Sequence, residues 1–120
     1  MEDVNNIIGA LAAVTSAQHI TRSWPAADAV DLDPIIVLRL ASESCTARYD
    51  DVAYLMETVY DLRVFARDPA QADAVAEEAR LCMHGLGYQR VFTAEETSAA
   101  MHQRMSRFSK SWQTERMIEP

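Results

Sequence analysis

The feature that most constrains the fold is a helix whose two ends are both marked in the sequence. Asp68 has the side chain of an N-cap, and Pro69 suits the first helical position. We expect the helix to end at Gly85 or Gly87, because glycine accepts the left-handed conformation. The apolar stripe of this helix comprises Val75, Ala79, Cys82 and Leu86, with Ala72 and Ala76 beside it. A stripe of this kind has to be buried against another layer of secondary structure.

Strand patterns precede this helix. Residues 35–41 are rich in β-branched and apolar side chains, and residues 52–64 alternate between apolar and polar, which predicts two strands. We interpret residues 42–49, which are polar, as the hairpin tip between them. Residues 19–24 are predicted to be a short extended piece. Residues 25–34, which mix acids, alanines and prolines, are predicted to form an exposed loop.

The remaining segments complete the order of elements. An amphipathic helix is predicted over residues 3–14. After the central helix we expect a strand over residues 88–92, an acidic loop over 93–98 and a final strand over 100–108. Residues 113–120 show no periodicity and are interpreted as a flexible tail.

Together these elements predict an α+β fold with a single domain over residues 1–112. Strands joined by short turns pair antiparallel, so we expect an antiparallel sheet of about four to five strands. Two helices would pack on one face of it, in the order helix, strand, hairpin, helix, hairpin. The 120 residues suffice for one hydrophobic core.

The charge of the chain limits the partners that it can have. Its 18 acidic and 11 basic residues give a formal net charge of -7, which argues against binding to nucleic acid or to anionic lipid. The acidic start Met1-Glu2-Asp3 differs from a signal peptide, and no apolar run approaches about 18 residues. We therefore expect a protein that assembles in a reducing cytoplasm, with free thiols at Cys45 and Cys82.

Side chains with catalytic or metal-binding chemistry do not converge in the sequence. The histidines are His19, His84 and His102, and their spacing matches no metal motif. The acidic pairs Asp50-Asp51 and Glu95-Glu96 are expected in turns, where adjacent carboxylates are solvated. We therefore predict that the protein is not an enzyme, with no catalytic residues, no metal and no cofactor.

A basic and aromatic stretch near the end is the one hint of nucleic-acid binding. It comprises Arg104, Arg107, Phe108, Lys110 and Trp112. Cations interleaved with aromatic rings stack bases on the sheets of some RNA-binding domains. We prefer the interpretation that this is a strand with one charged face, because the chain as a whole is acidic.

The segment between Tyr60 and Trp112 resembles the tail-completion, or tail-to-head joining, proteins of long-tailed bacteriophages. In that family a strand of the type y-d-l-x-v-w/f precedes an amphipathic helix, which ends in l-G and an aromatic residue. A strand, a loop and a terminal strand with an R-F pair follow. The matching residues here are Tyr60, Leu62, Val64, Phe65, Leu86, Gly87, Tyr88, Arg107 and Phe108. The N-terminal helix and the strand that begins at Pro34 lie in the expected order.

The resemblance implies a structural protein of the virion neck, made in the host cytoplasm. It implies a homo-oligomeric ring, commonly a hexamer, that completes the head-proximal end of the tail tube. Such a ring would contact the tail tube protein and the head-side connector, and DNA would pass through its channel without specific binding. It implies neither enzymatic activity nor association with a membrane.

Sheet edges carry unpaired backbone groups that a ring can satisfy between subunits. We therefore expect the 52–64 strand or the 100–108 strand at a subunit interface. The candidate interface residues are Val52, Tyr54, Met56, Met101, Met105, Phe108 and Trp112. An acidic lumen would repel DNA, so the candidate channel-facing residues are Asp50, Asp51, Glu95 and Glu96.

Three other readings are compatible with these patterns. The first is a different head–tail connector component, such as a stopper or an adaptor. The second is a small ferredoxin-like domain that binds a ligand or acts as an enzyme, which would need a pocket with converging polar groups. The third is an RNA-binding sheet, which would need a basic exposed face.

Overall fold

A computed structural model describes residues 4–17, 19–22, 34–49, 53–97 and 102–114 of the chain. The helices and strands are α1 (Val4–Val14), β1 (His19–Thr21), β2 (Ile35–Tyr49), β3 (Ala53–Ala66), α2 (Pro69–Gly85), β4 (Gln89–Thr97) and β5 (His102–Thr114). The predicted loop 25–34 lies outside the described residues, apart from Pro34.

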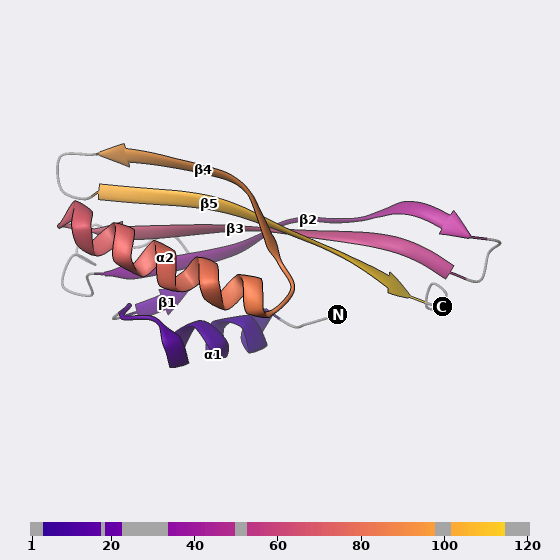
Figure 1. Cartoon of the computed structure of the whole chain (residues 1–120), viewed down its shortest axis with the longest axis horizontal. Helices are drawn as coiled ribbons and strands as arrows, with labels where there is room; N and C mark the ends of the chain where they lie inside the picture. The colour runs from indigo at the N-terminus through magenta and orange to yellow at the C-terminus, as the bar shows by residue number, and fades with distance from the viewer. Residues whose placement is uncertain (1–3, 18, 23–33, 50–52, 98–101, 115–120) are drawn as a thin grey trace.

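The predicted α+β class is confirmed: the described strands form one five-stranded sheet in the order β1-β2-β3-β5-β4, and both helices lie on one face of it (Figure 1). Three of its strand pairs are antiparallel, but β1 pairs parallel to β2. The prediction of a wholly antiparallel sheet was therefore wrong at this edge. The register also places β5 between β3 and β4, so β3 is an interior strand and β5 is interior over residues 102–109, where β4 pairs with it.

Both ends of α2 use the signals that the sequence carries. The Asp68 carboxylate accepts a hydrogen bond from the Ala70 N–H at 3.1 Å, and Pro69 is the first helical residue. At the other end the Tyr88 N–H donates to the Met83 carbonyl and the Gly87 N–H to the His84 carbonyl, both at 2.9 Å. This pair of bonds is the Schellman arrangement, and Gly87 supplies its left-handed residue with φ of 95°.

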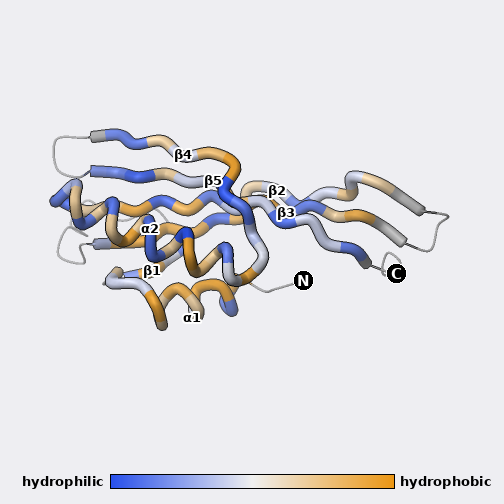
Figure 2. Tube along the Cα trace, in the orientation of Figure 1, coloured by the Kyte–Doolittle hydropathy of each residue, from blue (hydrophilic) through white to orange (hydrophobic). Residues whose placement is uncertain are grey.

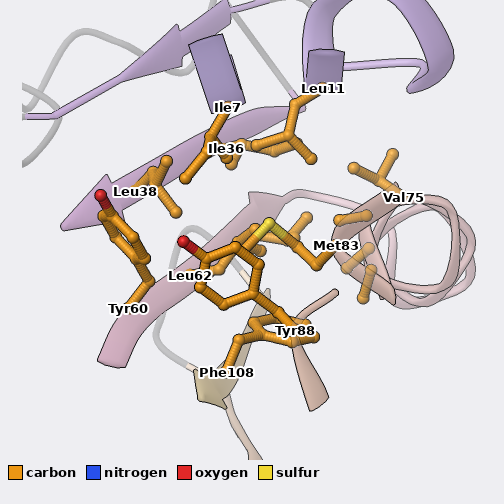
Figure 3. Packing of buried hydrophobic residues seen from close by; sticks show 14 of the residues in the cluster. Ile7, Leu11, Ile36, Leu38, Tyr60, Leu62, Val75, Met83, Tyr88 and Phe108 are labelled. Carbon is orange, nitrogen blue, oxygen red and sulfur yellow. The ribbon is translucent and has the colours of Figure 1, made fainter. Parts of the chain in front are cut away.

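The hydrophobic core lies between the helices and the sheet (Figure 3). Helix α2 contributes Ala72, Val75, Ala76, Ala79 and Met83, and α1 contributes Ile7 and Leu11. From the sheet come Ile36, Leu38, Tyr60, Leu62, Val64, Ala66 and Phe108, with Tyr88 from the turn after α2. The rings of Tyr60 and Tyr88 meet edge to face with centroids 5.7 Å apart. The predicted helix face is confirmed at Val75 and Ala79, whereas Cys82 lies at its margin, half-buried.

The sheet continues well beyond the helices. We call this extension the arm: residues 42–49 of β2, 53–59 of β3 and 110–114 of β5 (Figure 1). Because of the arm the molecule is elongated, with extents of 52 × 24 × 23 Å. The prediction that residues 42–49 form a hairpin tip was wrong, because they pair with β3 as far as Tyr49 and Ala53. Polar side chains suit a strand that is exposed to solvent, and their identity alone does not distinguish it from a turn.

Two more predicted boundaries change for the same reason. The acidic segment 93–98, predicted as a loop, is the second half of β4 as far as Thr97, with Glu95 and Glu96 paired to β5. Strand β5 runs to Thr114, two residues into the predicted tail. Cross-strand pairing, which a single segment does not reveal, decides both ends.

Candidate functional site

The face of the sheet opposite the helices carries a row of charged and aromatic side chains. Arg39 of β2, Asp61 of β3, Arg107 of β5 and Phe92 of β4 are successive cross-strand partners. Arg63 lies two residues along β3 from Asp61 and therefore shares its face. We call this surface the open face, because the helices cover the other side of the sheet (Figure 1).

A groove with a volume of about 310 Å³ follows this row. Its lining comprises Val37, Arg39, Leu40, Ala41, Asp61, Arg63 and Arg107. The described lining thus combines three arginines with one aspartate, although the chain as a whole is acidic.

Asp61 is held by one of these arginines. Arg107 donates from Nε to Asp61 Oδ1 at 2.8 Å and from Nη2 to Oδ2 at 3.2 Å, which is the bidentate geometry of a strong charge-assisted pair. The hydrogen bond to Asp61 and its negative charge raise the pKa of Arg107 above its ordinary value. Arg107 is thus paired with Asp61, and both Arg107 and Arg39 are exposed to solvent.

An apolar side chain borders the charged row: Phe92, the cross-strand partner of Arg107, is 50% exposed. Val91, in the bulge of β4, is 58% exposed, and Figure 2 shows an apolar stretch where β4 bends. Leu40, which also lines the groove, is 50% exposed on β2. Met105, half-buried, is the cross-strand partner of both Arg63 and Ala94. Arginine, methionine and aromatic side chains together are typical of the central part of protein–protein interfaces.

The helix side of the sheet has a separate charged cluster. Asp73 of α2, Glu95 of β4 and His102 of β5 place one ligand atom each within 4.8 Å of the others, which is a donor set that a metal ion could use. However, Arg104 Nη1 lies 3.0 Å from Asp73 Oδ1 and 3.6 Å from Glu95 Oε2. The guanidinium thus supplies the positive charge between these carboxylates. We interpret the cluster as an ion-pair network that fixes the first half of α2 to β4 and β5.

A second hollow, of about 200 Å³, lies beside the C-terminal end of α2. Its lining comprises Arg80, His84, Tyr88, Gln89, Arg90 and Phe108. Arg80 is bound by Glu77, with Nε 3.0 Å from Oε1. The ammonium of Lys110 lies over the Tyr88 ring, with Nζ 5.3 Å from the ring centroid, and it donates to the Leu86 carbonyl at 2.9 Å. This region serves mainly to close the end of α2.

The arm is fastened internally by a buried hydroxyl. Thr58 is fully buried; its Oγ1 accepts from Trp112 Nε1 at 2.9 Å and donates to Glu43 Oε2 at 3.1 Å. On the other face of the sheet, Ser109, directly before the arm on β5, donates to Glu57 of the arm at 2.9 Å. These bonds join β2, β3 and β5 by side chains as well as by backbone, so the arm is a defined element of the structure.

Those predicted interface residues whose side chains the structure describes do not form one surface. Val52 and Met101 lie outside the described residues, as does the side chain of Tyr54. Phe108 is 1% exposed in the core and Met56 is 8% exposed, so neither side chain is available to a neighbouring subunit. Met105 and Trp112 are half-buried, on the open face and in the arm respectively. The described parts of the 52–64 and 100–108 strands are paired on both sides over residues 54–64 and 102–108, so they offer no free sheet edge there, and their place at a subunit interface stays a prediction.

Of the four acids predicted to face the channel, the structure describes two, Glu95 and Glu96. Asp50 and Asp51 lie outside the described residues. Glu95 is on the helix side, where its carboxylate lies 3.5 Å from His102 Nε2 as well as beside Arg104. Glu96 is exposed and pairs with Gln103 on β5.

The basic and aromatic stretch of β5 is divided by the alternation of the strand. Arg104, Phe108, Lys110 and Trp112 lie on the helix side, and Arg107 lies on the open face. The arginines of the open face therefore come from three strands, Arg39 from β2, Arg63 from β3 and Arg107 from β5. Sequence reasoning missed Arg39 and Arg63, because their proximity to Arg107 depends on the register between strands. The sequence signal that could have pointed to them is that Arg39 interrupts the apolar run 35–41 and Arg63 is a polar position of the alternating run 52–64.

The cysteines are free, as predicted. Cys45 is exposed on β2, in the arm, and Cys82 is half-buried on α2. Burial raises the pKa of the Cys82 thiol. None of the helices described here is long and apolar enough to cross a membrane.

Comparison of the sequence with protein-family models and with curated proteins gave no match.

Proposed function

We propose that this chain is a structural subunit of the neck of a long-tailed bacteriophage, which forms a ring that completes the head-proximal end of the tail tube. The proposal starts from the resemblance of residues 60–112 to tail-completion proteins. The observation that carries it is the arm, a three-stranded extension of the sheet beyond both helices (Figure 1).

The physical argument concerns what such an arm needs. In the described part of the sheet, β1 pairs with β2 only over residues 35–37, so β2 forms the outer edge of the sheet from Leu38 to Tyr49. An edge of this length carries unpaired backbone N–H and C=O groups. A ring satisfies such an edge by placing the same neighbour beside every copy.

In this proposal the ring contacts the tail tube protein on one side and the head-side connector on the other, and DNA passes through its channel. The open face, whose groove holds three arginines, would retard DNA if it lined the channel, since each phosphate contact adds affinity through counterion release. We therefore place the open face in contacts between subunits and not in the lumen.

The native mass of the purified protein, measured over a range of concentrations, tests the proposal. We expect a ring-sized species whose electron micrographs show a central channel, and we expect no binding of duplex DNA by the assembled protein at low salt. A monomer or a dimer at every concentration would contradict the ring, the dimer favouring the ferredoxin-like alternative. A salt-sensitive gel shift would favour the nucleic-acid reading instead.

A further inference from the structure

We propose that the hollow beside the C-terminal end of α2 binds a small tetrahedral oxyanion, of the phosphate or sulfate type, between Arg80 and Arg90. This role is additional to closing the end of α2, and the inference does not depend on the proposed ring.

The walls of the hollow come from two elements that follow each other in the chain. Arg80 and His84 lie four residues apart on α2 and therefore on the same side of the helix. Arg90 on β4 is the cross-strand partner of Phe108, whose ring lies in the core between sheet and helices, so Arg90 is on the helix side of the sheet. Residues 86–88 join the helix directly to the strand. The two guanidinium groups thus line one hollow from two different elements.

The described lining of the hollow combines two arginines and a histidine with no acidic side chain. The acidic neighbour is Glu77, three residues before Arg80 on α2, with a side chain that is 54% exposed. Hydrogen bonding to Arg80 is the main cause that lowers the pKa of Glu77, and the charge of Arg90 contributes to the same shift. Arg80 and Arg90 together therefore exceed Glu77 by one positive charge, before any contribution from His84.

Arg80 is positioned by Glu77 and still has donors to offer to a ligand. Glu77 accepts from Nε of Arg80 at 3.0 Å and also from Nη2. A guanidinium group has five N–H donors, of which Glu77 takes two, so three of them are not bonded to Glu77. Because Glu77 already orients the planar group, Arg80 loses little freedom when it binds a second anion.

The backbone at this end of α2 offers few free acceptors that would repel an anion. A helix C-terminus ordinarily disfavours an anion, because its last carbonyl groups carry partial negative charge. Here the carbonyls of Met83 and His84 accept N–H groups of the following turn, and the Leu86 carbonyl accepts from Lys110 Nζ at 2.9 Å. The side chains therefore dominate the charge that an ion in the hollow would meet.

The size and the surroundings of the hollow favour a small ion over a polyanion. Its volume is about 200 Å³, and a single water needs only about 10–15 Å³ of cavity volume, so a tetrahedral ion fits together with several waters. The chain has a formal net charge of -7, and Glu77 lies next to the arginines. A polyanion such as duplex DNA would be repelled by this charge, whereas a small ion meets mainly the local arginines.

Titration of the protein with sodium phosphate, followed by NMR, tests the site. The pH and the ionic strength are held constant with sodium chloride. We expect saturable shifts of the Nε–H signals of Arg80 and Arg90 and of the backbone amides of residues 88–90. The dissociation constant should be millimolar, because exposed charge pairs are weak. A duplex oligonucleotide at the same phosphate concentration should leave these signals unchanged.

The variants Arg90→Gln and Arg22→Gln separate the site from a general effect of charge. Both arginines are exposed and each replacement removes one positive charge, but of the two only Arg90 lines the hollow. We expect Arg90→Gln to weaken phosphate binding at least about threefold, and Arg22→Gln to bind like the wild type. The double variant Arg80→Gln with Arg90→Gln should show no saturable shifts.

Thermal melting verifies that each variant is folded, and if the double variant is not, the comparison of the two single variants decides. A wild type without saturable shifts would overturn the site. Unchanged binding by Arg90→Gln would also overturn it, and so would an equal loss in both single variants. Shifts with the oligonucleotide that match or exceed those with phosphate would overturn the choice of a small ion as the ligand.

Discussion

At the scale of single residues, Gly87 shows most clearly how one position fixes the local structure. Its positive φ allows the Schellman bonds that end α2 and direct the chain into β4. A Cβ at this position would lie 3.1 Å from Cε of Lys110, whose ammonium donates to the Leu86 carbonyl. Gly87 therefore serves both the backbone turn and the close approach of β5.

Replacing Gly87 by alanine should destabilise the domain by about 1–2 kcal/mol, the cost of a left-handed conformation for a residue with a Cβ. Displacement of the Lys110 side chain would add to this. Gly85→Ala is the matched control: it lies in the last turn of α2 with open space around its Cβ, and it should be neutral or stabilise by up to about 1 kcal/mol. Urea unfolding measures both, and equal stability of the two variants would contradict this role of Gly87.

At the scale of elements, α2 is the part that joins the sheet to α1. Its buried face contacts core residues of both, and its capped ends fix where that face begins and ends. The ion pair between Arg104 and Asp73 adds a polar attachment at the first half of the helix.

Ala79→Asp on α2 should unfold the domain or nearly so. Ala79 is fully buried, and an unpaired carboxylate there costs several kcal/mol, against a total stability of about 5–15 kcal/mol for a typical domain. Ala74→Asp introduces the same side chain on the exposed side of the same helix and should cost no more than about 1 kcal/mol. Thermal melting compares the two; a normal melt for Ala79→Asp would show that the face is misassigned.

The sequence predicted α2 well because its signals are local: an N-cap, a proline, an apolar stripe and two glycines all lie within one segment. The arm half of β2 was missed because a polar, exposed strand is supported by its partner strand and not by its own composition. The open face was missed for a related reason. Arg39 and Arg107 become neighbours only through the registers of β2 with β3 and of β3 with β5.

At the scale of the whole molecule, the structure divides into a body with a helix layer and an arm without one (Figure 1). The body holds the core, whereas the arm is held by strand pairing and by bonds such as those of Thr58. The two parts should therefore differ in how strongly assembly affects them.

Amide hydrogen exchange should reveal this difference. In dilute subunits we expect residues 42–49 of β2 to exchange quickly along their outer edge, and we expect them to become protected on assembly as a neighbour covers the arm. The interior amides of α2 act as an internal control, because their bonds lie within one subunit in either state. Exchange in residues 42–49 that is equally fast before and after assembly would contradict a role for the arm in subunit contacts.

The central position of β5 has a consequence for the synthesis of this protein. β5 is translated after all the other described elements, yet within the sheet it is the sole link between β4 and the rest. A nascent chain that stops before β5 leaves β3 with an open edge and lacks Arg107, one of the groove's three cations. Completion of the sheet is thereby coupled to completion of the groove, so a truncated translation product has no finished surface with which to join an assembly.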